Sequence, residues 1–374
     1  MFADSRDSDL ADSLRANVSR FAAYKADYVK TTIENILNDA SIPAKDKQAY
    51  IDANMNAFSQ YQATEETTAT SRSRTAKQWK EFNDPQRLRL FPNLRWLRTR
   101  SVIPREVHLK FHDHVWSKDD DFWKTNTPGT EWNCKCDVEE TDDPVTDKSE
   151  IEEYIKKIKV PPALEGNPAE TGKVFTDDAS YIKKARKDAV KETVSKCYYK
   201  DSGSDMQISV MADRSELADN IHTGRILAKT ESVTIRPHFE QEPGHPIKNP
   251  EYVIDGEIVD AKRVLSAEGV HAGFRAAIKQ GAKVVIIDFG NGEYKKQQNG
   301  KEDKIHYNIK ETAKAISNRF SDFKNGIITK CYVVYKGKYI KIEKDLFDTY
   351  PNNNKTDRIK RIDWLVDNLK LLKT

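Results

Sequence analysis

The chain lacks several features that would place it in a specialised class. Its 374 residues hold four cysteines, two of them in the run Cys134-Lys135-Cys136, and this usage argues against a disulfide scaffold. We therefore expect a reducing compartment or a metal site. No apolar run approaches the roughly 20 residues of a membrane-spanning helix. No charged-then-apolar signal segment opens the chain, so we expect no membrane partner.

Strong net charge and internal repeats are also missing. The sequence has 62 Lys and Arg against 59 Asp and Glu, for a formal net charge of +3. Gross charge therefore does not indicate nucleic-acid binding, and any basic surface must be local. We find no repeat with a solenoid period. The length leaves room for two domains or three.

One stretch, residues 249–262, predicts a tight β-hairpin. Residues 252–254 are a short β-favouring run, and Ile258-Val259 opens a second one. Asp255-Gly256 between them is a hairpin turn signal. Two antiparallel strands joined by this turn are expected.

Three side chains with catalytic potential fall on this hairpin. Asp260 and Lys262 are two residues apart on one strand and so share a face, and Glu251 lies across on the partner strand. Two carboxylates can hold a divalent cation such as Mg²⁺, which polarises a phosphate and lowers the pKa of a bound water. The lysine can orient that water or stabilise developing negative charge. An ordinary hairpin with a surface Asp–Lys pair is the alternative, since the D-x-K pattern is common.

The segments after the hairpin predict a helix and a buried strand. Residues 270–280 have an apolar helical face, and Gly281 caps this helix. Residues 282–289 are largely apolar, as in the centre of a buried sheet. The order hairpin, helix, buried strand is typical of α/β nucleases.

This region resembles the C-terminal tRNase domains of bacterial contact-dependent growth inhibition toxins. The matching residues are Asn249-Pro250-Glu251, Ile254-Asp255-Gly256, Asp260-Ala261-Lys262, the strand at 284–287 and a late hairpin at 331–339. The first acid is Glu where the family has Asp, and the second is Asp where it has Glu. The resemblance implies the PD-(D/E)xK nuclease fold, a mixed sheet flanked by helices. It also implies an acidic residue on the first helix of the domain, for which Glu216 is the best match; a solvated helix Glu is the alternative.

The N-terminal region is expected to be helical. Residues 5 to about 40 keep helical spacing of apolar side chains, and Ser41-Ile42-Pro43 ends this helix. A second helix is predicted from about residue 44 to 61. The Thr/Ser-rich run at 64–75 is either a loop or the start of another helix.

Residues 91–140 combine four tryptophans with two cysteines in a loop-like stretch. This segment resembles the C-terminal half of phage Mu F-like minor head proteins. The similarity rests on Trp96 and Thr99, Pro104 and His108, Asp120-Asp121-Phe122-Trp123, Pro128, and Trp132-Asn133-Cys134-Lys135-Cys136. It implies a head-morphogenesis module at residues 1–140 that binds phage portal or capsid proteins.

The same segment contains a candidate zinc site. Cys134, Cys136 and His108 are ligand types that Zn²⁺ prefers, and His112 or His114 is a candidate fourth ligand. The C-x-C spacing is tighter than the usual C-x2-C of zinc sites. Buried, apolar cysteines are the alternative.

The remaining divisions follow from composition. Residues 141–200 are expected to be a linker or helical connector, 201–345 the nuclease-like domain, and 346–374 a C-terminal amphipathic helix. Four further side chains are candidates for phosphate contacts, and the histidines among them also for acid–base work: His222, Arg225, His238 and His245. A structural role for each is the alternative.

Together these observations predict an α+β protein with a helical phage head module and a toxin nuclease. Its expected activity is tRNA cleavage with a divalent metal, its expected partners include a cognate immunity protein, and its expected locations are the virion interior and the bacterial cytoplasm. Two alternatives stay open. One is a purely structural head protein with an inactive nuclease-like domain, and the other is a metal-independent RNase of the barnase/colicin-like group.

Overall fold

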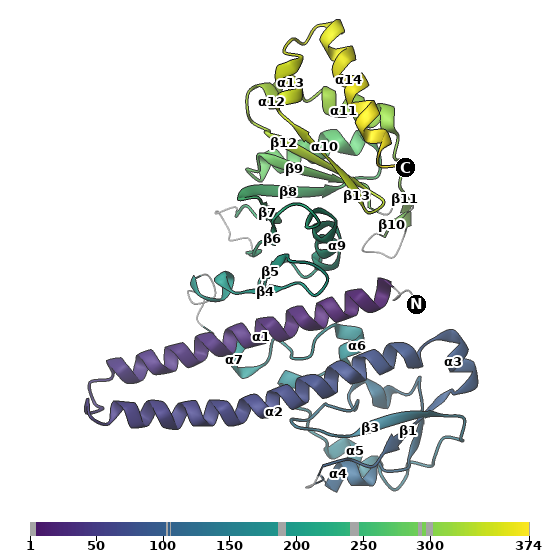
Figure 1. Ribbon diagram of the computed structural model, residues 1–374. Coiled ribbons are helices and arrows are strands. Elements are labelled where there is room, and N and C mark those ends of the chain that lie inside the picture. The colour runs from purple at the N-terminus through teal and green to yellow at the C-terminus, as the bar shows by residue number, and fades with distance from the viewer. Residues whose placement is uncertain are drawn as a thin grey trace. The chain divides into compact units, whose positions relative to one another are not determined.

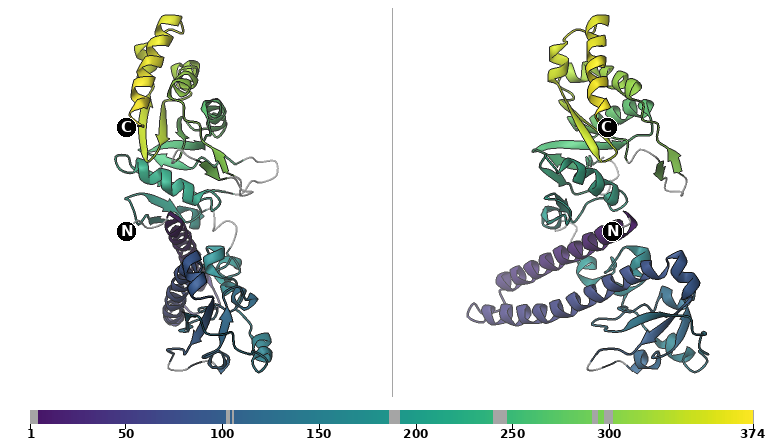
Figure 2. Two further views of the ribbon diagram at one scale, coloured as in Figure 1. Left: turned by 90° about the vertical axis from the view of Figure 1, so that its right-hand side faces the viewer. Right: turned by 45° about the vertical axis from the view of Figure 1, so that its right-hand side comes forward.

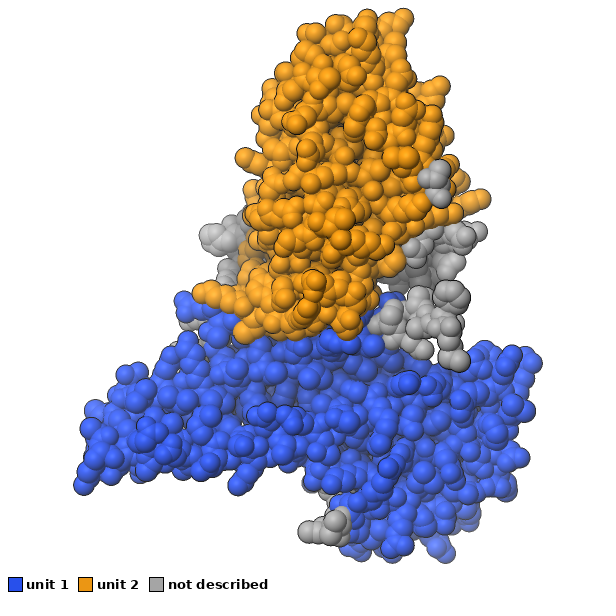
Figure 3. Space-filling view, in the orientation of Figure 1, with its two compact units in different colours: residues 1–194 blue, residues 195–374 orange. Residues whose placement is uncertain are grey.

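The structure of the chain is a computed structural model that divides into two compact units. It describes residues 5–101, 104, 106–185, 192–239, 247–290, 294–296 and 302–373. Unit 1 comprises residues 1–194 and unit 2 residues 195–374 (Figure 3). None of the described helices is both long enough and apolar enough to cross a bilayer.

Unit 1 contains a hairpin of two long helices, α1 (Ser5–Asn38) and α2 (Lys47–Phe82). The two helices run side by side, as Figure 1 and the right-hand view of Figure 2 show. The predicted break at residues 41–43 separates them, as the sequence indicated. Ser41 donates to the Asp39 carboxylate, which stabilises this turn.

The second helix is longer than the sequence predicted, since the Thr/Ser-rich run continues it without interruption. Thr67, Thr68 and Thr70 each donate their hydroxyl to the carbonyl four residues earlier. This bonding satisfies side chains that otherwise favour turns. Beyond them, α2 buries Ala76 and Trp79 against the rest of the unit, and this packing outweighs weak helix propensity.

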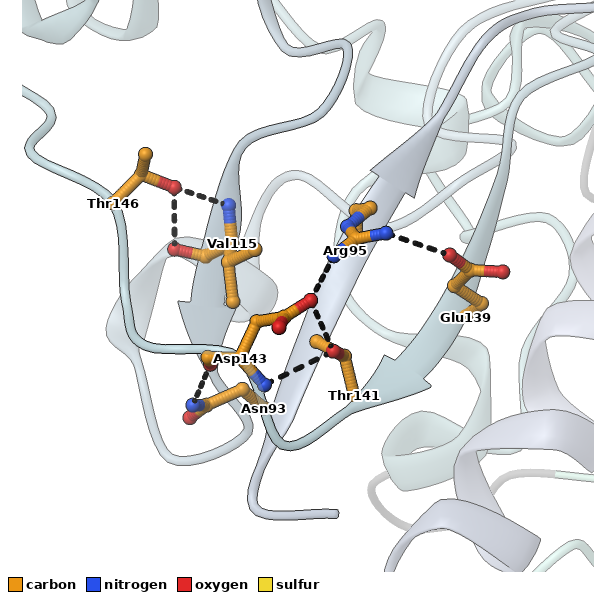
Figure 4. Close-up of polar contacts among 7 residues, drawn as sticks. All are labelled: Asn93, Arg95, Val115, Glu139, Thr141, Asp143 and Thr146. Atoms are coloured by element: carbon orange, nitrogen blue, oxygen red, sulfur yellow. Dashed lines mark hydrogen bonds and ion pairs between the residues drawn. The ribbon is translucent and has the colours of Figure 1, made fainter.

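A small antiparallel sheet, in the order β2-β1-β3, forms the other part of unit 1. Its strands and adjacent short helices are β1 (Asn93–Leu97), β2 (Val115–Ser117), β3 (Asp137–Thr141), α3 (Pro85–Leu90), α4 (Glu106–Lys110) and η1 (Asp121–Lys124). Polar contacts join the strands to the chain that follows β3 (Figure 4). Asn93 Nδ2 donates to the Asp143 carbonyl at 2.8 Å, and Arg95 bridges Asp143 and Glu139.

Aromatic side chains fill the core beside this sheet. Trp96 stacks on Trp123 with ring centroids 6.2 Å apart, and Trp116 stacks on Phe122 at 4.3 Å. Phe111 packs edge-on against Trp96 at 5.1 Å. The loop-like stretch therefore folds around anchored aromatics, whose burial dominates the energetics of such a core.

Residues 141–200 were expected to be a linker or helical connector, but many of them pack into unit 1. Its helical elements are α5 (Glu152–Lys157), η2 (Pro162–Leu164), α6 (Pro168–Thr171), α7 (Ser180–Lys183) and η3 (Val194–Lys196). Leu164 and Val174 are fully buried in the core of unit 1. The buried guanidinium of Arg72 on α2 donates to the carbonyls of Val174 and Gly166. Proline and glycine here make tight turns inside a packed unit, which local composition cannot distinguish from a linker.

Unit 2 is built on a mixed eight-stranded sheet with the order β13-β12-β9-β8-β7-β6-β5-β4. Its strands are β4 (Tyr198–Lys200), β5 (Gln207–Ser209), β6 (Val233–Ile235), β7 (Tyr252–Ile254), β8 (Glu257–Arg263), β9 (Val284–Asp288), β12 (Lys330–Tyr335) and β13 (Lys338–Glu343). Strands β10 (Tyr294–Lys296) and β11 (Glu302–Lys304) form a separate pair. The mixed α+β class that we expected is thus present.

Both predicted hairpins are confirmed, one in the middle of the sheet and one at its edge. β7 pairs antiparallel with β8, and Asp255 and Gly256 between them have φ of +49° and +82°. Positive φ at both turn positions matches the right-handed twist of the two strands. Lys336 and Gly337 make the same kind of turn between β12 and β13.

Helices cover the sheet and complete the core of unit 2. They are α9 (Leu217–Leu227), α10 (Ala267–Lys279), α11 (Ile309–Ser317), α12 (Phe320–Lys324), α13 (Asp345–Thr349) and α14 (Lys355–Lys370). α10, α11 and α14 share one apolar cluster with β9 and β12. Leu365 and Leu369 of α14 are fully buried there, whereas Ile359 of the same helix is 47% exposed.

Candidate functional site

The hairpin brings Glu251, Asp260 and Lys262 together on one face of the sheet. The Lys262 ammonium lies 2.8 Å from Asp260 Oδ2 and 3.3 Å from Glu251 Oε1. Glu251 Oε2 accepts a 2.8 Å hydrogen bond from the Ala261 amide, which fixes its carboxylate across the strand. One lysine therefore sits between two carboxylates, in the arrangement that the sequence predicted.

This face is closed on one side by helix α10. Gly273 of α10 lies so near the sheet that a Cβ there would be 3.2 Å from Lys262 Cβ and 3.1 Å from Ile287 Cδ1. Glycine allows this close approach of helix to strand. The helix therefore confines the stem of Lys262, whose side chain as a whole remains 25% exposed. Sequence reasoning did not single out Gly273, because its role depends on contacts between distant segments.

The two hairpin acids differ in their access to solvent. The Asp260 side chain is fully buried, and the Glu251 side chain is 13% exposed. Neither oxygen of Asp260 receives a well-aligned hydrogen bond among the described residues, and its contact with Lys262 is an ion pair. Buried carboxylate oxygens normally have hydrogen-bond donors, so this carboxylate retains an unused capacity to accept or coordinate.

The electrostatics show an excess of acid in this group. Burial, followed by the charge of Asp260, raises the pKa of Glu251 to about 7. Burial also raises the pKa of Asp260, although Lys262 opposes the rise. For Lys262 burial lowers the pKa, but the charges of Glu251 and Asp260 outweigh it and the pKa rises. A protonated Lys262 therefore does not fully compensate the two acids.

Glu216 adds a third carboxylate at the edge of this group. It is the residue before α9, and the residue as a whole is exposed. Its carboxyl is nonetheless desolvated enough that burial is the first cause of a raised pKa, with the charge of Glu251 second. The first helix thus brings an acid near the hairpin, at the position suggested by the motif.

The other polar residues considered from sequence are placed differently. Arg225 is ion-paired with Asp201, and His238 Nδ1 lies 3.4 Å from Asp213 Oδ2. His222 is an exposed residue of α9, and His245 lies outside the described residues. None of these observations places a histidine beside Lys262.

A buried acid at the end of β9 escaped the sequence reasoning. Asp288 is 2% exposed, accepts a 2.6 Å hydrogen bond from Thr223 Oγ1, and lies 3.4 Å from Arg263 Nε. It joins α9 to the sheet. One signal in the sequence could have indicated Asp288: it is a charged residue at the end of an otherwise apolar strand.

Unit 1 contains a separate group with a different chemistry. His108, Cys134 and Cys136 are all buried, and one ligand atom of each lies within 4.8 Å of the others. His108 Nδ1 is 3.3 Å from Cys136 Sγ and 3.8 Å from Cys134 Sγ. A hydrogen bond from Cys136, with help from His108, holds the pKa of Cys134 at about 4 although burial opposes it, and the pKa of Cys136 is raised. These three residues can hold a metal ion.

The two further histidines proposed as ligands do not join this group. His112 is 41% exposed and faces Asp113, and His114 Nδ1 lies 3.2 Å from the His112 carbonyl. Both follow α4 in the turn that leads into β2. The expectation of a fourth histidine ligand was therefore wrong.

Comparisons with known proteins give little further information. No protein-family model matches the chain, and no curated protein matches it significantly. Among solved structures, the chain is similar to a CdiA-CT/CdiI toxin and immunity complex from Burkholderia pseudomallei, with 17% identity and a TM-score of 0.23. The match covers 34% of this chain and 85% of that chain. A similarity at this level carries no argument about function, which depends on the site itself.

Proposed function

We propose that unit 2 is a nuclease that uses a divalent metal ion to hydrolyse phosphodiester bonds. The observation that carries this proposal is the group of Glu251, Asp260 and Lys262, with Glu216 beside it. The group is buried at its base, partly open at the lysine end, and has raised carboxyl pKa values. Perturbed carboxyls around a positioned lysine are typical of functional sites rather than of ordinary surface ion pairs.

The residues fit a divalent cation of the Mg²⁺ type. Among the described residues, Asp260 offers two buried oxygens without aligned donors, and Glu251 Oε1 lies 3.3 Å from the Lys262 ammonium. With all three acids ionised, three negative charges face one positive charge, and two further positive charges would balance the group. Hard cations such as Mg²⁺ take carboxylate oxygens as ligands and commonly use one or two from the protein. Bound here, the ion would polarise the phosphate and acidify a water ligand.

The protein side chains have separable roles in this proposal. Asp260 and Glu251 would hold the ion, and the Ala261 amide keeps Glu251 oriented. Lys262, whose raised pKa keeps it protonated, orients the attacking water or stabilises the negative charge of the transition state. Glu216 completes the acidic rim and can accept a proton from the water.

The finer parts of the proposal rest on sequence motifs alone. They are a PD-(D/E)xK-type fold, tRNA as substrate, an immunity protein as partner, and a phage head module in unit 1. The Glu and Asp at positions 251 and 260 are interchanged relative to the toxin motif. The Cys and His group of unit 1 takes no part in this chemistry.

The test uses the full chain with bacterial tRNA and with plasmid DNA, in Mg²⁺ and in EDTA. We expect cleavage that stops in EDTA and falls by about 100-fold or more in Lys262→Met and Asp260→Asn, since a positioned catalytic group typically contributes about 100-fold or more. Lys330→Met is the matched control, because Lys330 is a partly buried, ion-paired lysine on the same sheet. Its activity is expected to match the wild type.

Two other outcomes would replace the proposal. Cleavage of RNA that is indifferent to EDTA and to Lys262→Met would move the chemistry away from the hairpin and indicate a metal-independent RNase. No cleavage of either substrate by a folded chain would favour a structural protein with an inactive domain.

A further inference from the structure

We propose that unit 1 contains a Zn²⁺ site formed by His108 Nδ1, Cys134 Sγ and Cys136 Sγ, with a water molecule as the fourth ligand. The site is independent of the proposed nuclease and serves the folding of unit 1. The spacing, burial and connectivity of these three side chains support the site.

The spacing of the three atoms is that of ligands around one zinc ion. Zn–S bonds of about 2.3 Å and Zn–N bonds of about 2.0 Å at a tetrahedral angle place S and N about 3.5 Å apart. The two Nδ1–Sγ distances, 3.3 and 3.8 Å, lie on either side of this value. An ion would therefore enter with side-chain shifts of a few tenths of an ångström.

The orientation of His108 also suits a ligand. Its Nδ1 faces both sulfurs, whereas Nε2 points to the opposite side, with Glu131 Oε2 at 3.9 Å. A carboxylate on the far side of a ligand histidine favours the proton on that nitrogen and leaves the other for the metal. The Trp96 ring packs edge-on against the imidazole, with centroids 5.7 Å apart, and limits its rotation.

The ligand count and burial define the kind of site. Over the part of the chain that the structure describes, no fourth Cys, His, Asp or Glu atom joins the group. The neighbouring residues outside it, at positions 102, 103 and 105, are Val, Ile and Arg and are not zinc ligands. Three protein ligands leave one position for water. Cys134 and Cys136 are 3% and 1% exposed, so access for a substrate is closed and the role is structural.

Such an ion would join two segments that are distant in sequence. His108 lies on α4, and both cysteines lie in the loop that enters β3. This loop turns at Asn133, whose φ of +59° lies in the left-handed region that asparagine adopts more readily than most residues. Metal binding can supply the stability that a loop-rich core of this kind needs.

The first measurement is the metal content of the reduced full chain after incubation with Zn²⁺ and desalting. We expect about one zinc ion per chain to be retained through desalting, since thiolate and imidazole are ligands that Zn²⁺ prefers. Loading with Co²⁺ should give thiolate-to-metal charge-transfer absorption. This absorption reports sulfur ligation directly, without any variant.

The variants Cys134→Ser and Cys136→Ser should both lose zinc and the charge-transfer band. Cys331→Ser is the matched control, because Cys331 is a fully buried cysteine of unit 2, and it should retain both. Wild-type chain that retains no zinc, or Co²⁺ that binds without thiolate absorption, would refute the site. The contacts would then be a plain thiol–imidazole hydrogen-bond network.

Discussion

Replacement of Glu251 by glutamine should stabilise the metal-free protein at pH 8. In the folded chain the pKa of Glu251 is about 7, against an ordinary value of 4.5, because of burial and the charge of Asp260. A carboxyl with a raised pKa contributes its full stability below pH 4.5, and the contribution is lost as pH rises through 7. Each pKa unit corresponds to about 1.4 kcal/mol, so the loss is about 3 kcal/mol. Glutamine resembles the protonated acid and avoids this loss.

The assay is urea denaturation of the full chain at several pH values without divalent ions. The unfolding free energies of wild type and Glu251→Gln should agree near pH 4.5 and diverge by about 3 kcal/mol in favour of the variant above pH 7. Glutamine can still accept the Ala261 hydrogen bond, which keeps the hairpin geometry. Glu257→Gln, on the same hairpin and ion-paired with Lys330, is the control and should show no such divergence.

Addition of Mg²⁺ distinguishes a metal-binding site from an ion pair that binds no metal. The wild type should gain stability above pH 7 in millimolar Mg²⁺, since an ion that binds only the folded state stabilises it, and Glu251→Gln should gain much less. Parallel pH profiles for the two proteins, or a variant less stable than the wild type at pH 8, would contradict a raised pKa of Glu251.

Two further substitutions test the packing around each unit's core. Gly273→Ala places a Cβ within 3.2 Å of Lys262 Cβ, and we expect nuclease activity to fall about tenfold or more, because small displacements of a positioned group are costly. Gly269 lies on the same helix, and a Cβ there would be 3.1 Å from Val264 Cβ, so Gly269→Ala is the control and should leave activity unchanged. Equal losses of activity in both variants would contradict the role of Gly273 in positioning Lys262. Arg72→Leu should lower the unfolding free energy of unit 1 by several kcal/mol, because carbonyls that the buried guanidinium contacts, including Val174 and Gly166, lose a donor. A small change in the melting temperature, measured by circular dichroism, would show that water replaces these hydrogen bonds.

Local patterns in the sequence were sufficient for the parts of the fold that depend on neighbours in the chain. The β7–β8 hairpin was predictable since its turn residues, Asp255 and Gly256, adopt positive φ readily. The strand β9 was predictable from an unbroken apolar run, and α1 from its helical spacing. Spacing two residues apart also placed Asp260 and Lys262 on one face, as the structure shows.

The sequence was misleading where tertiary packing outweighs local preference. The Thr/Ser-rich run continues α2 because its hydroxyls bond the preceding turn and its far end is buried. The stretch after β3 looked like a linker, yet Leu164 lies in the core of unit 1. Glycine, proline and polar residues are compatible with both outcomes, and only contacts with distant segments decide between them.

By itself, then, the sequence determined which side chains were available at the hairpin and in the C-x-C segment. The tertiary structure decided how they are used. It buries Asp260, raises the pKa of Glu251, sets Gly273 against Lys262, and brings His108 to the two cysteines. These properties arise from desolvation and from contacts between residues far apart in the chain, and neither is encoded in any short stretch of residues.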